Sequence, residues 1–254
     1  MILSKLDQQF LEENKDLIAD EDWDKLYTKL RTSPAIIKLY DILKEAGIDL
    51  INDYYICPNG CAAHCETLPP DLHIPEGVKS IGSAAFFRTN LEKVHLPTTV
   101  RDIGPGAFAY CDDLVEITIP APIDTLGMNA FKNCNSLKEI KFAKTSNLHY
   151  IDEGTFQHSG LEEITLPEGI KTIREYAFKN CYFLTKINLP KSLTKIMSGA
   201  FSGSQFFKEI SYAGTKEQFR KMDLEEGWIA YQEEVIIVKC SDGTLRILAG
   251  EVVD

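Results

Sequence analysis

Apolar residues recur in a fixed order from about residue 70 to residue 212. An Ala-Phe step or its equivalent marks each copy, at intervals of 22, 23, 25, 22 and 23 residues: Phe86, Phe108, Phe131, Phe156, Phe178 and Phe201. The full unit reads L-x-x-I-x-L-P-x-x-V-x-x-I-x-x-x-A-F-x-x-C. A period of this length predicts a solenoid, because one unit cannot bury its own apolar face and must stack on its neighbours.

The I-x-L step has the period of a β-strand, with its two apolar side chains directed inward. The proline that follows ends the strand, since it has no N–H to donate. We therefore predict about seven rungs that share one parallel β-sheet. The outward positions form the predicted partner-binding face: Lys93, His95, Glu116, Thr118, Glu139, Lys141, Glu163, Thr165, Lys186, Asn188, Glu209 and Ser211.

This unit resembles the BspA-like class of bacterial leucine-rich repeats over about residues 70–212. The resemblance implies a leucine-rich-repeat solenoid that presents a binding surface. Departures from the unit are local. Ala143 replaces the proline of its copy, the stretch from Phe142 to Leu148 is two residues longer than its counterparts, and the turn at Gly160 is one residue short.

Both ends of the chain depart from the repeat, so we expect an α/β repeat solenoid with three parts. Residues 1–66 are predicted to form a helical N-terminal cap and residues 67–212 the solenoid. Residues 213–254 are predicted to form a mixed α/β cap, with a helix at 215–224 and strands at 235–238 and 244–248. Caps of this kind cover the apolar core and strand edge at the ends of a solenoid. The helical start of the first part, from Phe10-Leu-Glu-Glu-Asn-Lys-Asp-Leu-Ile18 through Ala46-Gly-Ile-Asp49, also resembles the N-terminal part of repeat proteins encoded by bacteriophages and prophages.

The net charge of −11 changes the choice of partner. Most of the acidic excess lies in residues 1–66 and 213–254, and no Lys/Arg cluster is present. Nucleic acid and anionic membrane surfaces are therefore poor partners. We find no signal-peptide pattern and no apolar run long enough to span a bilayer. We expect a cytoplasmic protein, in a host cytoplasm if phage-encoded, whose seven cysteines are reduced.

One cluster of residue types suggests a metal: Cys57, Cys61, His64 and Cys65. Thiolates and imidazole are zinc ligands, but structural sites usually take two ligands from one segment and two from another well downstream. We interpret these residues as unligated, with a structural zinc ion as the alternative. A second set recurs three positions after each Phe, where a small polar group bonds to the backbone of a turn: Thr89, Cys111, Cys134, Ser159, Cys181 and Ser204.

The chain contains no H-E-x-x-H, G-x-S-x-G or G-x-x-x-x-G-K motif, so we predict no catalytic residue and no cofactor. The leading hypothesis is a non-enzymatic protein-interaction module, such as a phage protein that binds a bacterial host or defence protein. A surface-associated adhesin is the alternative. A metal-regulated switch or enzyme built on Cys57, Cys61, His64 and Cys65 is the third hypothesis. The sheet face, the edge loops with Tyr110, Tyr182 and Phe183, and the acidic caps are all candidate contact surfaces.

Overall fold

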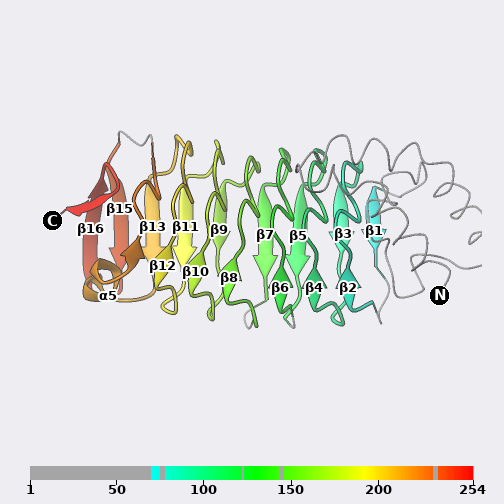
Figure 1. Ribbon diagram of the computed structural model, residues 1–254, viewed down its shortest axis with the longest axis horizontal. Coiled ribbons are helices and arrows are strands. Elements are labelled where there is room, and N and C mark those ends of the chain that lie inside the picture. Colours follow the sequence, from blue (N-terminus) through cyan, green and yellow to red (C-terminus); the bar gives the residue numbers. More distant parts are fainter. Residues whose placement is uncertain (1–69, 75–77, 122, 144–145, 231–233, 254) are drawn as a thin grey trace, which may run out of the picture. The chain divides into compact units, whose positions relative to one another are not determined.

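A computed structural model describes residues 70–74, 78–121, 123–143, 146–230 and 234–253, all within one compact unit of chain, residues 50–254. The predicted helical cap over residues 1–66 lies outside the described residues. The described part is a parallel β-solenoid, in which strands of two kinds alternate along the chain (Figure 1).

The longer strands stack in parallel and in register, as the I-x-L step predicts. Each pairs the same repeat position with its neighbour, as Val94 does with Ile117. The strands are β1 (Asp71–His73), β3 (Lys93–His95), β5 (Glu116–Ile119), β7 (Glu139–Phe142), β9 (Glu163–Thr165), β11 (Lys186–Leu189) and β13 (Glu209–Tyr212). We call their outward side the strand face. These strands delimit about six complete turns, so the predicted seven rungs count strands rather than turns.

A second parallel ladder runs along the other side of the core, and the sequence did not predict it. It contains two-residue strands, and in all but the last of them the second residue is buried, where the second apolar residue of the V-x-x-I step lies. The strands are β2 (Ser80–Ile81), β4 (Asp102–Ile103), β6 (Thr125–Leu126), β8 (Tyr150–Ile151), β10 (Thr172–Ile173), β12 (Lys195–Ile196) and β14 (Asp223–Leu224). Two residues are too short a run for strand alternation to be visible in the sequence.

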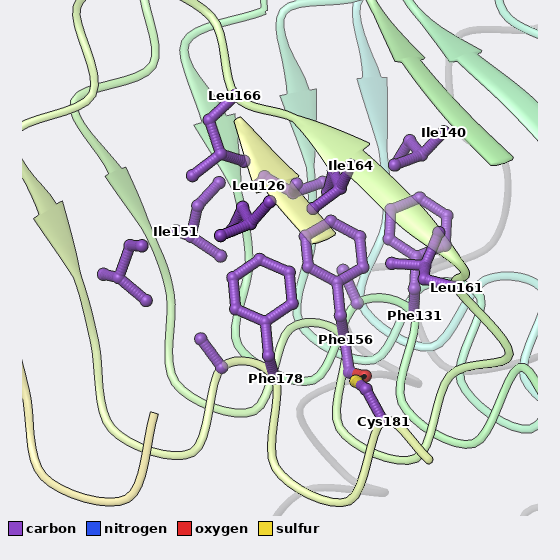
Figure 2. Close-up of a cluster of buried hydrophobic side chains, with 14 of the residues drawn as sticks. Leu126, Phe131, Ile140, Ile151, Phe156, Leu161, Ile164, Leu166, Phe178 and Cys181 are labelled. Atoms are coloured by element: carbon purple, nitrogen blue, oxygen red, sulfur yellow. Dashed lines mark hydrogen bonds between the residues drawn. The ribbon is translucent and has the colours of Figure 1, made fainter. Parts of the chain in front are cut away.

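The core is a set of columns, each made of one repeat position. The phenylalanines of the Ala-Phe steps are fully buried and stack nearly parallel, with ring centroids 5.1 to 5.7 Å apart. Figure 2 shows Phe131, Phe156 and Phe178 in one such row, beside the inward Ile140 and Ile164. Stacking of this kind adds about 0.5–1.5 kcal/mol per pair to the burial of the rings themselves.

Each Ala-Phe turn contains two residues with positive φ, one two positions before the phenylalanine and one two positions after it. The first column is Ala84, Gly106, Asn129, Gly154, Tyr176 and Gly199, and the second is Arg88, Tyr110, Asn133, His158, Asn180 and Gly203. Glycine and asparagine accept this left-handed conformation most readily, whereas other residues lose about 1–2 kcal/mol. The packing of the phenylalanine column imposes the turn on Tyr176 and Arg88 as well.

Both ladders are interrupted between the third and fourth of these turns. Strand β7 pairs with β5 but not with β9, and β6 pairs with β4 but not with β8, among the residues that the structure describes. The longer copy with Ala143 leads across this point. Hydrogen bonds of the Ala-Phe turns continue through it, from Phe131 N to Thr155 O at 2.8 Å for example. We call this place the junction. Within the described chain, the hydrogen bonds of the Ala-Phe turns, rather than strand pairing, join the two halves there.

The C-terminal residues continue the solenoid before closing it. Strand β14 adds to the ladder of short strands, and β15 (Ile236–Cys240) pairs in parallel with β13. Strands β16 (Gly243–Leu248) and β17 (Glu251–Val253) then add antiparallel. Trp228 anchors this end, because its Nε1–H donates to Gly250 O at 2.9 Å and its ring meets Phe201 edge-on.

The described residues contain one helix, α5 (Lys216–Arg220), with Thr215 as N-cap in a capping box with Gln218. The predicted helix to residue 224 is therefore too long, since Leu224 belongs to β14. The expected α/β class is also wrong for the described chain, which is nearly all sheet. No helix in this part is long and apolar enough to cross a membrane.

Candidate functional site

The twelve predicted face residues all lie on β3 to β13, on the side opposite the buried column. Their side chains are exposed on β3, β7 and β9. On β11 and β13 they are only partly exposed, as is Glu116 on β5, whereas Thr118 on β5 is exposed. The alternation of the I-x-L step thus placed them correctly. Whether they bind a partner is a separate question, and it depends on which of their charges are already paired within the molecule.

On the N-terminal half of the strand face the charges pair with one another. Glu116 lies 3.5 Å from Lys93 and 3.7 Å from Lys141, and Lys141 lies 3.0 Å from Glu139. The hydrogen bond from Lys141 to Glu139 raises the pKa of that lysine. Two lysines and two glutamates neutralise each other here, so this half presents little net charge to a partner.

At the C-terminal end of the face, Glu209 accepts from Lys239 and lies 3.2 Å from Lys186. The hydrogen bond from Lys239, followed by that from Lys186, lowers the pKa of Glu209. Lys239 belongs to β15, so sequence reasoning missed it: the helix and loop that precede β15 break the repeat register.

Between these two groups lies a stretch with an unpaired acid. Glu163 on β9 is exposed and has no ion pair among the described residues. Beside it Asn188 donates to Thr165 at 2.8 Å. We call Glu163, Thr165 and Asn188 the central stretch; its carboxylate and polar groups remain available to a partner.

Large aromatic side chains stand at one edge of the strand face, in the turns that lead into β11 and β13. Phe183 is 60% exposed and Phe206 54% exposed, and each precedes a fully buried residue of the same column. Tyr182 is also exposed, with its ring edge-on to His158. We call Tyr182, Phe183 and Phe206 the aromatic edge. Phe206 was missed in the sequence, although it is the counterpart of Phe183 one turn later.

The small polar and thiol residues three positions after each phenylalanine have a structural role, as the sequence predicts. The thiols of Cys111, Cys134 and Cys181 are buried and donate to the phenylalanine carbonyls of the preceding turns, Cys181 to Phe156 O at 3.0 Å (Figure 2). Ser204 makes the same bond at 2.9 Å. Burial raises the pKa of Cys111 and of Cys181 to about 11. Thiols in this state are poor nucleophiles.

A shallow hollow of about 470 Å³ lies on the side of the short strands, near the junction. Arg174 is one of the residues that line it, and its guanidinium lies over the Tyr150 ring at 3.9 Å and pairs with Asp152 at 2.9 Å. The cation is therefore already engaged on both sides.

The zinc candidates Cys57, Cys61, His64 and Cys65 lie outside the described residues. At the N-terminal end of the described residues, Asp71 and His73 on β1 extend the strand face by one more strand. The predicted partner-binding face begins at Lys93, so it does not include the outward residues of β1.

The comparison with protein families matches the description "BspA type Leucine rich repeat region". It finds six copies, over residues 56–182 and 144–223. No curated protein matches the chain.

Several solved structures are similar. A leucine-rich repeat protein from Eubacterium ventriosum is 25% identical with a TM-score of 0.58, over 64% of this chain and 42% of its own. A leucine rich cell surface protein from Faecalibacterium prausnitzii is 22% identical with a TM-score of 0.42, over 65% of each chain. A leucine-rich repeat protein from Bacteroides ovatus is 25% identical with a TM-score of 0.44, over 61% of this chain and 51% of its own. The chain thus spans less than two thirds of each of these relatives.

Proposed function

The chain belongs to the family of BspA-type leucine-rich repeat proteins, and from that premise we propose that it binds a folded protein partner on the C-terminal half of the strand face. Leucine-rich repeat proteins are protein-interaction modules, in which a rigid array of turns presents an extended surface. The mechanism is surface complementarity without turnover, with contacts from the central stretch and the aromatic edge.

The size of the strand face supports a contact that reaches beyond it. Six steps of about 4.8 Å and strands about 10–13 Å long give a footprint on the order of 350 Å². A stable interface takes about 800 Å² from each partner. A partner on the strand face must therefore also cover one of its edges.

The exposed rings of the aromatic edge are the observation that supports assigning the partner contact to this edge of the strand face. Phe183 and Phe206 expose more than half of their side chains on adjacent turns. Nothing in the repeat requires large aromatic residues there, since the same position holds Asp113 and Ser136 in earlier copies. Aromatic side chains, phenylalanine included, are enriched in interfaces, and the residues that contribute most of the binding energy cluster near the interface centre.

The central stretch supports a partner with a basic or hydrogen-bond-donating surface. Glu163 holds the one strand-face carboxylate of β5 to β13 without an ion pair among the described residues. The paired charges on either side of it contribute little, because their mutual attraction must first be given up. A partner lysine or arginine would find its counter-charge at Glu163.

The test begins with capture of partners by the full chain from its native cell, followed by measurement of Kd for the purified pair. We expect the double substitution Phe183→Ser/Phe206→Ser to weaken binding by at least about 30-fold, as loss of one interface anchor of about 2 kcal/mol does. Glu163→Lys is expected to weaken it at least about tenfold by placing like charges together.

Val115→Ser is the matched control, since Val115 is exposed at the same edge but stands before β5, in the N-terminal half. It should leave Kd unchanged. The proposal is contradicted if the double variant and Glu163→Lys both bind with wild-type affinity while Val115→Ser binds more weakly. That result would show that the partner contacts the N-terminal half of the strand face.

We further propose that the partner is a protein of a bacterial host and that binding takes place in the host cytoplasm. The resemblance of the N-terminal residues to phage-encoded repeat proteins supports this choice, and the acidic ends favour a basic partner surface. Fractionation of cells that express the native gene tests it. Recovery of the chain from the cell surface would favour the adhesin instead.

A further inference from the structure

Two histidines and an aspartate meet at the N-terminal end of the strand face. His73 on β1 and His95 on β3 occupy the same register position on adjacent parallel strands. Their rings stack with centroids 4.0 Å apart and planes 11° from parallel. Asp71 lies two residues before His73, so it points to the same side of β1. All three side chains are more than half exposed.

The polar atoms of the three side chains converge. Asp71 Oδ1 lies 2.8 Å from His95 Nε2 and 3.6 Å from His73 Nε2, and all three ligand atoms lie within 4.8 Å of one another. A tetrahedral zinc ion with bonds of about 2.0–2.1 Å holds its ligand atoms about 3.3 Å apart. Displacements of a few tenths of an ångström to about 1 Å, together with a rotation of the two stacked rings that aims both Nε2 atoms at the ion, would produce that geometry, and exposed side chains can make both movements.

The backbone beneath these side chains is fixed by the fold. Leu72 and Val94 lie between the candidate ligands on their strands, point inward, and are each 3% exposed. Ile74 N donates to His95 O at 3.0 Å and closes the ladder just beyond the histidines. The ligands thus stand on paired strands rather than on loops, which reduces the ordering that a bound ion must impose.

We propose that Asp71, His73 and His95 form a binding site for a divalent transition metal ion of the zinc class. Two imidazole nitrogens and one carboxylate oxygen are ligands that this class accepts, whereas Mg²⁺ and Ca²⁺ favour oxygen alone. Three protein ligands leave a fourth position for water or for a side chain of another molecule. The ion would also join β1 to β3 and so stabilise the pairing of these two strands.

The site stands apart from the proposed partner contact, which uses the aromatic edge and the central stretch. His73 faces the same carboxylate oxygen as His95, since its Nε2 lies 3.6 Å from Asp71 Oδ1. A metal ion would engage both histidines together, because their Nε2 atoms lie near the same carboxylate oxygen.

The test titrates the full-length protein with Zn²⁺ and, for its spectrum, with Co²⁺. We expect saturable binding that His95→Ala and Asp71→Asn each weaken at least about tenfold, as expected for loss of a group that holds a metal. The His73 and His95 imidazole resonances should shift together during the Zn²⁺ titration. Mg²⁺ at the same concentration as Zn²⁺ should not displace the bound Zn²⁺.

His149→Ala is the matched control, since His149 is an exposed histidine away from the strand face. It should bind as the wild type does. The Co²⁺ spectrum separates this site from the cysteines at 57, 61 and 65, because thiolate ligands add a charge-transfer band that imidazole and carboxylate lack. Asp71→Asn keeps the size of its side chain, so a result is obtained even where His95→Ala lowers stability.

The proposal is overturned if His95→Ala and Asp71→Asn bind Co²⁺ with wild-type affinity and spectrum. It is also overturned if thiolate charge transfer accounts for all of the bound metal, or if no metal binds. None of these outcomes bears on partner binding, which is measured with the aromatic-edge variants.

Discussion

The rings of Phe131 and Phe156 lie 5.7 Å apart, the widest step in the phenylalanine column, where neighbouring steps are 5.1 to 5.3 Å. The same step spans the junction, where both strand ladders are interrupted among the described residues. The two rings still stack with their planes 8° apart. They therefore pack across a place where strand hydrogen bonding contributes nothing.

We expect Phe156→Ala to lower the free energy of unfolding by about 3–5 kcal/mol, because it removes a fully buried ring and leaves a cavity. Chemical denaturation measures the change. Phe206→Ala is the control, because that ring is more than half exposed and its loss should change stability by less than about 0.5 kcal/mol. Equal effects of the two substitutions would contradict the packing described for the column.

Gly160→Ala should also destabilise the junction. A Cβ at residue 160 would lie 2.1 Å from the backbone oxygen of Asn135, so the short turn must move apart. We expect a loss of about 1–3 kcal/mol, the usual effect of overpacking. Gly227→Ala separates this clash from backbone strain: its φ is +71° but its nearest atom is 3.8 Å away, so about 1 kcal/mol is expected. A smaller loss for Gly160→Ala than for Gly227→Ala would show that the turn relaxes freely.

The buried thiols predict a loss of stability at alkaline pH. The pKa of Cys111 and of Cys181 is about 11 in the folded protein, above the ordinary value of 9.0, because burial disfavours the thiolate. The folded state thus holds these protons more tightly than the unfolded state does. The contribution of the two protonated thiols to the free energy of unfolding is complete below pH 9. It is lost as pH rises from 9 to 11, by several kcal/mol for the two together.

The double variant Cys111→Ser/Cys181→Ser isolates this effect from the titration of lysine and tyrosine. Serine fits the column, as Ser204 shows by bonding to Phe178 O. The difference in unfolding free energy between wild type and variant should stay constant below pH 8, and the wild type should lose stability relative to the variant above pH 9. Parallel pH profiles for the two proteins would exclude the thiols as the cause.

We expect the hydrogen bond of the Trp228 indole to stabilise the last two strands. Trp228→Phe keeps most of the ring but removes the hydrogen bond to Gly250 O, and we expect a loss of about 1–3 kcal/mol because that carbonyl is left unsatisfied. Amide exchange on β16 and β17 should quicken in the variant. Leu248→Ala, at a side chain 46% exposed, should leave those rates unchanged.

The sequence predicts the longer strands and the strand face because a β-strand has a side-chain period of two residues. Val94 and Ile117 identify the buried column, and that fixes Lys93 and His95 on the other side. Local period says nothing about which turns form hydrogen bonds with each other. The interruption between β7 and β9 therefore has only an indirect sign in the sequence, the longer copy at Ala143.

Other features depend on tertiary packing that overrides local preference. Tyr176 and Arg88 adopt positive φ although neither residue type favours it, so the two left-handed columns do not follow from residue type. The approach of Asp71 to His95 joins residues on two different strands, and it needs the register between β1 and β3 to be known. Lys239 reaches Glu209 only because β15 continues the ladder after the repeat pattern has ended.

The junction also bears on how this chain loses its structure. Repeat arrays unfold as chains of coupled neighbours, so cooperativity ends where the coupling between neighbours is weakest. Within the described residues that place lies between β7 and β9. We expect unfolding that starts at one end to pause there, leaving one block folded on its own. The block of β9 to β17 includes the aromatic edge and Glu163, so partner binding would hold that block together while the other opens.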